Sequence, residues 1–160
     1  MKKLLFSLLL LTGCGFTPLY SQNNTYLKDT QITVDPIPNQ YGNQMRQILQ
    51  TSLKTNVENP QNQYRLIVTP PTFKAGDKTI TADEFASTMQ ILGKTSYYLE
   101  DLKTKKNIYF GNLVSVSSYT VVKDPYATTV AQNHIQEELS KQLAQQVALD
   151  VLAKLSEEQK

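Results

Sequence analysis

The sequence has one cysteine and one histidine among 160 residues, and both scarcities limit its chemistry. His134 has no second histidine with which to hold a metal ion, and Cys14 has no second thiol with which to form a disulfide. No P-loop, Rossmann glycine pattern or HExxH motif is present. The acidic pairs, such as Asp83-Glu84 and Glu137-Glu138, are sequence neighbours whose side chains point in different directions. We therefore predict a protein that is not an enzyme and that holds no metal ion and no cofactor.

The sequence also lacks an apolar run long enough to cross a membrane. The run from Leu4 to Leu11 has eight residues, whereas a bilayer core requires about 20 residues of helix. Lys2 and Lys3 precede this run and small residues close it, which is the layout of a secretory signal. The closing Leu11-Thr12-Gly13-Cys14 resembles the bacterial lipobox, in which the chain is cleaved before the cysteine and the cysteine receives a diacylglyceryl group. We predict a signal peptide at 1–13, cleavage between Gly13 and Cys14, and lipid on Cys14; the alternative is an ordinary signal with an incidental cysteine.

An excess of charge of one sign is absent from the mature chain. Without Lys2 and Lys3 the 16 basic residues become 14, which equals the number of acidic residues. A neutral domain of this kind argues against nonspecific binding to nucleic acid. Position two of the mature chain, directly after Cys14, is Gly15, whereas aspartate at that position commonly retains bacterial lipoproteins at the inner membrane. We therefore expect a lipid-anchored protein on the periplasmic side of the outer membrane.

The tether after the lipidated cysteine, residues 14–29, begins with apolar and stiff residues in place of flexible glycine and serine. Proline reduces the backbone entropy that is lost on binding, and aromatic side chains bury a large area with few rotatable bonds. We interpret these residues as candidates for packing against a partner protein, with simple contact to the membrane as the alternative; they are Phe16, Pro18, Leu19 and Tyr20.

Hydrophobic periodicity predicts one α+β domain over residues 30–160. Alternating patterns predict strands at about 31–34, 64–69, 85–100 and 108–116, and helical spacing predicts helices at 39–57 and 124–155. Gly76-Asp77 is interpreted as part of a loop, and the last two strands as a hairpin. We expect a two-layer sandwich in which two helices cover one face of a four-stranded mixed sheet. In the last strand, the residues expected on the packed face are Ile108, Phe110, Val114 and Val116.

The last helix carries an apolar stripe that steps by four residues from Ile135 to Leu155. Four residues turn about 400°, so the stripe drifts around the helix and does not face one flat core along its whole length. Either the helix crosses a twisted sheet, or part of the stripe meets another protein.

The start of the mature chain, Cys-Gly-Phe-Thr-Pro-Leu-Tyr at 14–20, resembles that of the lipopolysaccharide-assembly lipoproteins of the LptE family in alphaproteobacteria. The expected order of strand, helix, three strands and helix resembles that family's fold, as does Asp124-Pro125-Tyr126-Ala127 at the start of the last helix. The resemblance implies a partner, the LptD outer-membrane β-barrel, whose lumen such proteins plug, and contact with lipopolysaccharide. The alternative is an auxiliary outer-membrane lipoprotein of an ABC-type lipid transporter.

The turn between the two long strands carries three lysines within four residues, Lys103, Lys105 and Lys106. Lysine clusters can hold phosphate groups as point charges, so we regard these residues as candidates for binding lipopolysaccharide. The alternative is a solubilising turn that discourages pairing between sheet edges.

Overall fold

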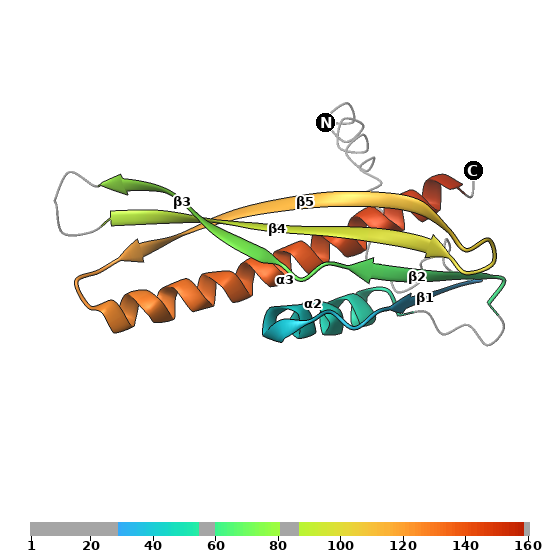
Figure 1. Cartoon of the computed structure of the whole chain (residues 1–160), viewed down its shortest axis with the longest axis horizontal. Coiled ribbons are helices and arrows are strands. Elements are labelled where there is room, and N and C mark those ends of the chain that lie inside the picture. Colours follow the sequence, from blue (N-terminus) through green and yellow to red (C-terminus); the bar gives the residue numbers. More distant parts are fainter. Residues whose placement is uncertain (1–28, 55–59, 81–86, 159–160) are drawn as a thin grey trace, which may run out of the picture.

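The computed structural model describes residues 29–54, 60–80 and 87–158. These residues form the predicted α+β sandwich, in which two helices cover one face of a mixed sheet (Figure 1). The predicted cleavage site at Gly13 and Cys14 lies outside the described residues, as do Phe16, Pro18, Leu19 and Tyr20. The elements follow the order β1 (Thr30–Val34), α2 (Asn39–Ser52), β2 (Asn62–Val68), β3 (Thr72–Ile80), β4 (Ser87–Asp101), β5 (Lys106–Val121) and α3 (Pro125–Glu158).

The sheet has five strands where the sequence predicted four, because β3 occupies the stretch that was interpreted as a loop. Both β2 and β3 pair with the same side of β4: Val68 lies opposite Tyr97, and Thr72 lies opposite Lys94. Pro70-Pro71 therefore separates β2 from β3, but both strands continue along the same edge of β4, which is long enough to pair with the two in succession. A register shift between Ala75 and Lys78 places a bulge where a turn was expected.

The remaining strands complete the mixed sheet. β1 pairs with β2 in parallel, and β5 pairs with β4 in antiparallel fashion along almost its full length, as the predicted hairpin requires. A β4–β5 register shift lies between Leu99 and Glu100. Because β2 and β3 share one side of β4, no more than four of the five strands lie side by side at any point of the sheet.

The start of α2 depends on close packing around a glycine. The Asn39 side chain accepts a hydrogen bond from the backbone N–H of Gly42 at 2.8 Å, and Asn39 itself has a φ of 67°. A Cβ at Gly42 would lie 2.7 Å from Ile37 Cγ2, so only glycine fits at this approach. The helix begins at Asn39 as expected but ends at Ser52, before the predicted end at residue 57.

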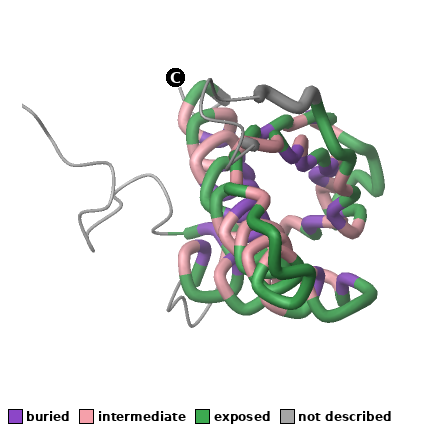
Figure 2. The backbone as a smooth tube through the Cα atoms, turned by 90° about the vertical axis from the view of Figure 1, so that its left-hand side faces the viewer, coloured by how far each residue is buried: buried purple, intermediate pink, exposed green. Residues whose placement is uncertain are grey.

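The core lies between the sheet and the two helices, where buried parts of strands and helices face one another (Figure 2). α3 contributes a continuous buried stripe only in its second half; the first half, before Leu139, contains no buried residue. The drifting stripe therefore meets the core where α2 and the sheet enclose it. The buried positions of α3 are Leu139, Ser140, Leu143, Ala144, Val147, Ala148, Val151 and Leu155.

Candidate functional site

The turn between β4 and β5 displays the three predicted lysines in a fixed loop. Asp101 organises this loop: its side chain accepts hydrogen bonds from the N–H of Lys103 at 2.8 Å and from the Thr104 hydroxyl at 3.0 Å. The hydrogen bond from the Lys103 backbone lowers the pKa of Asp101. Lys105 has a φ of 54°, which turns the chain back towards β5. Lys103, Lys105 and Lys106 are all exposed, and none belongs to an ion pair of the described residues.

A cleft with an apolar floor lies close to this turn, between β4–β5 and the end of α3. Its volume is about 210 Å³. The Lys154 side chain lines this cleft. Its ammonium lies 5.3 Å from the centre of the Tyr109 ring and 2.9 Å from a Glu157 carboxylate oxygen. The hydrogen bond with Glu157 raises the pKa of Lys154. The cleft is lined by Leu99, Ile108, Tyr109, Lys154, Leu155 and Glu157.

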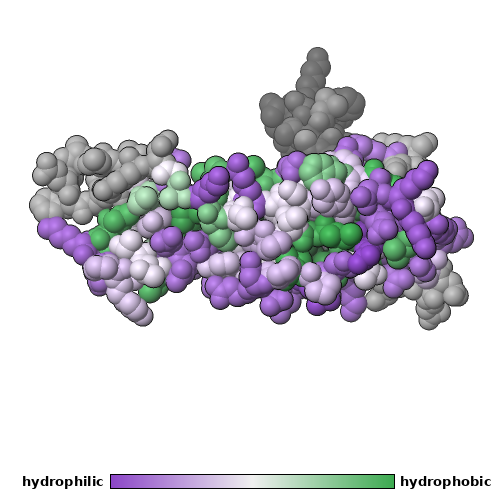
Figure 3. All heavy atoms as spheres, in the orientation of Figure 1, coloured by the Kyte–Doolittle hydropathy of each residue, from purple (hydrophilic) through white to green (hydrophobic). Residues whose placement is uncertain are grey.

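The face of the sheet that the helices do not cover carries exposed apolar side chains on β4 and β5, which we call the outer patch. The Tyr98 and Phe110 rings lie opposite each other in the register, with centroids 4.8 Å apart. β5 contains no charged residue between Lys106 and Lys123. Figure 3 shows that hydrophobic surface interrupts the hydrophilic surface of the molecule. The outer patch consists of Tyr98 (37 % exposed), Phe110 (47 %), Val114 (51 %) and Val116 (51 %).

The outer patch contradicts the prediction that Phe110, Val114 and Val116 face the core. The alternate residues of β5 face the helices instead, and two of them are small or polar for local reasons. A Cβ at Gly111 would overlap the buried ring of Tyr97, so glycine leaves the space that this ring fills. The Ser115 hydroxyl donates to Gln142 Oε1 of α3 at 2.8 Å. Because the inner positions include a glycine and a serine, the alternating apolar residues of β5 led to the wrong prediction of which face of the strand is buried.

His134, the only histidine, is exposed in the first half of α3. The described part of the chain contains no group of three or more histidine, cysteine or acidic residues that could hold a metal ion. Neither α2 nor α3 combines the length and hydropathy that a membrane-spanning helix needs.

Comparison with known proteins gives matches only at the level of structure. No family model matches the sequence, and a search of curated proteins finds no match. A lipoprotein from Caulobacter crescentus CB15 is 19 % identical with a TM-score of 0.55, and the similarity covers 84 % of this chain and 95 % of that one. Solved bacterial lipoproteins share the fold of this chain.

Two further structures agree with this result. The minor lipoprotein of Acinetobacter baumannii is 16 % identical with a TM-score of 0.53, and 79 % of this chain and 92 % of that chain are covered. Rare lipoprotein B from Shewanella oneidensis is 9 % identical with a TM-score of 0.52, and the coverage is 82 % and 98 %. At these identities the similarity concerns the fold alone, and it spans nearly the full length of each solved chain.

Proposed function

We propose that this chain is an outer-membrane lipoprotein that resembles LptE and acts with an LptD-like β-barrel in assembling the translocon that inserts lipopolysaccharide into the outer membrane. The proposed role is binding and not catalysis. The lipobox-like sequence ending at Cys14 would supply the anchor, and the domain would pack against the barrel.

The observation that carries this proposal is the outer patch. Four apolar side chains, each more than a third exposed, lie on the paired strands β4 and β5, and residues 107–121 of β5 carry no charge. Exposed apolar surface of this kind marks interaction sites, and the centres of protein interfaces are depleted of charged residues. A barrel interior that encloses this domain would cover the face of the sheet that the helices leave open.

The turn lysines give the second element of the proposal. Lys103, Lys105 and Lys106 form an exposed cationic end of the β4–β5 hairpin, held by Asp101, and phosphate groups of lipopolysaccharide provide the anionic partner. The two surfaces are separate, because the outer patch lies along the strands and the lysines lie at their tip. A protein could therefore hold the barrel and contact the lipid at the same time.

Recovery of the protein from native membranes tests the proposal. The tagged, lipidated chain should bring down a large outer-membrane β-barrel; recovery of an inner-membrane transporter would instead favour the ABC-type lipid-transport alternative.

The Cys14→Ala precursor should lose its lipid and should no longer fractionate with the outer membrane. If that precursor still fractionates with the outer membrane, the anchoring part of the proposal is wrong.

A further inference from the structure

A groove of about 290 Å³ lies between β1 and α2, and its lining includes none of the outer-patch residues or turn lysines. On the β1 side it is lined by four consecutive residues, 31–34, and on the α2 side by Arg46, Gln50 and Lys54. Successive side chains of a strand point to opposite faces, so four consecutive residues can line one groove only if the backbone edge of the strand forms its wall. Among the described strands β1 pairs only with β2, so within the described part of the chain its other edge has no strand partner.

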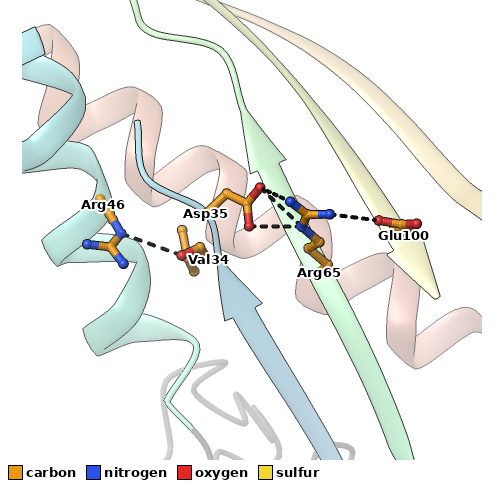
Figure 4. A network of polar contacts seen from close by, with 5 residues as sticks. All are labelled: Val34, Asp35, Arg46, Arg65 and Glu100. Carbon is orange, nitrogen blue, oxygen red and sulfur yellow. Dashed lines mark hydrogen bonds and ion pairs between the residues drawn. The ribbon is translucent and has the colours of Figure 1, made fainter. Parts of the chain in front are cut away.

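The hydrogen bonds of β1 show which peptide groups face the groove. The Asp35 N–H donates to the Leu66 carbonyl at 3.0 Å, and the Asp29 carbonyl accepts from the Asn62 N–H at 2.9 Å. The backbone N–H and C=O groups of the odd-numbered residues of this segment therefore point towards β2. The peptide groups of Ile32 and Val34 point to the other edge. Figure 4 shows Arg46 reaching from α2 to the Val34 carbonyl, with its Nε 3.5 Å from the oxygen, a distance that marks a weak hydrogen bond.

The charges of the groove are of one sign. Arg46 and Lys54 are cations, and no carboxylate is found among the described residues that line it. The nearest acid in sequence, Asp35, is already occupied: Arg65 donates to it from Nε at 2.9 Å and from a terminal nitrogen at 2.8 Å (Figure 4). The same arginine lies 3.7 Å from Glu100, so this triad ties β1 to β2 and β4. Neither Arg46 nor Lys54 forms an ion pair with a described residue, so the charge of each could be met by an anionic ligand.

We propose that this groove binds an extended acidic peptide segment of another protein, which adds to the β1 edge as a further strand. Main-chain hydrogen bonds to Ile32 and Val34 would supply affinity, and carboxylates facing Arg46 and Lys54 would supply selectivity. The tether of this chain does not suit the site. Its one acidic residue, Asp29, directly precedes β1 and its carbonyl already accepts a hydrogen bond from Asn62, while residues 14–28 contain no acidic residue and carry Lys28. The inference is independent of the proposed role with a β-barrel.

The binding test uses the lipidated mature chain in detergent and a fluorescein-labelled hexapeptide that alternates glutamate with valine or threonine. We expect saturable binding that salt weakens, and binding weaker by about tenfold or more when lysine replaces each glutamate. The Arg46→Gln/Lys54→Gln variant should lose affinity to a similar extent. The control variant, Lys74→Gln/Lys94→Gln, removes the same charge from exposed positions of β3 and β4 and should bind normally. Equal loss in both variants, or no saturable binding, would overturn the proposal.

Amide exchange separates strand addition from mere charge attraction. Saturating peptide should slow exchange at the Ile32 and Val34 amides by roughly tenfold or more, because their N–H groups gain acceptors. The Gln31 and Thr33 amides, which already point towards β2, should exchange at unchanged rates. A peptide in which proline replaces the central residues should bind without this alternating protection or not at all. Binding of the acidic peptide without protection at Ile32 and Val34 would contradict the proposed mode.

Discussion

Tyr97 shows how one residue connects the two layers of the fold. Its side chain is fully buried between the sheet and the helices, where its ring fills the space left by the missing Cβ of Gly111. Its hydroxyl donates a hydrogen bond to an Asp150 carboxylate oxygen of α3 at 2.5 Å. Burial, and then the hydrogen bond to Asp150, raise the pKa of Tyr97 well above the ordinary value for tyrosine. The tyrosine therefore remains a neutral donor throughout the physiological range.

Replacing this donor should weaken the connection between β4 and α3. Tyr97→Phe removes the hydroxyl and leaves Asp150 without that partner, so we expect the free energy of unfolding at pH 7 to fall by about 1–2 kcal/mol, measured by urea denaturation. Tyr98→Phe is the matched control, since Tyr98 is adjacent in sequence but lies on the outer face against Phe110. An equal loss in the two variants would show that the Asp150 hydrogen bond is not the cause.

The same pair of proteins should differ in pH dependence. The folded state raises the pKa of Tyr97, so the stability that this residue contributes is complete below the pKa of an unfolded tyrosine, near 10, and is lost as the pH rises through the folded value. The stability difference between the native protein and Tyr97→Phe should therefore narrow as the pH rises above about 10. A difference that stays constant from pH 7 to pH 11 would contradict this assignment.

At the scale of elements, the sequence predicted the helices and long strands well because their periodicity is strong. The predicted start of α3 at residue 124 agrees with the observed start at Pro125, and Asp124 caps this helix: its Oδ1 accepts from the Tyr126 N–H at 2.9 Å. β3 was missed because Lys74, Gly76, Asp77 and Lys78 are typical of a polar turn. That strand forms because the long β4 offers a pairing edge, which is information about a distant segment.

The Asp124 cap should stabilise the first turn of α3 and contribute little to the free energy of unfolding of the whole domain. Asp124→Ala removes the acceptor of the Tyr126 N–H, a change that costs helices about 1 kcal/mol. Because no residue of α3 before Leu139 is buried, we expect faster amide exchange at residues 126–130 and an unchanged urea midpoint for the whole domain. Glu137→Ala, an exposed change further along the helix, should leave the exchange of residues 126–130 unaltered. A clear fall in the urea midpoint would mean that the first half of α3 supports the core.

The β4–β5 turn yields a prediction about lipid binding. Replacing Lys103, Lys105 and Lys106 together with serine should weaken lipopolysaccharide binding by roughly tenfold at low salt, since each lysine near an anionic lipid surface contributes favourable attraction. The Asp101 hydrogen bonds involve backbone and Thr104 groups, so the loop should keep its shape. Serine at Lys74, Lys94 and Lys123, three exposed lysines outside the turn and outside the β1–α2 groove, is the control. Undiminished binding by the turn variant would exclude the hairpin tip.

At the scale of the whole molecule, the two faces of the sheet differ in what they leave exposed. The inner face is closed by α2 and α3, while the outer face keeps Tyr98, Phe110, Val114 and Val116 at the surface. The sequence could not separate these faces, because β5 is apolar at alternate outer positions while Gly111 and Ser115 point inwards. The contacts with Tyr97 of β4 and Gln142 of α3 explain why a glycine and a serine occupy the inner face of β5.

This asymmetry gives the sharpest test of the proposed contact with a β-barrel. Val114→Lys/Val116→Lys places two charges in the outer patch at half-exposed positions, so the melting temperature should change by no more than a few degrees. Recovery of the β-barrel from native membranes should fall severalfold, because charge at the centre of an interface must be desolvated. Gln145→Lys/Gln146→Lys adds the same charge at exposed positions of α3 and should retain the barrel. If the two double variants recover the barrel equally well, the outer face of the sheet is not the contact surface, and the exposed first half of α3 becomes the next surface to test.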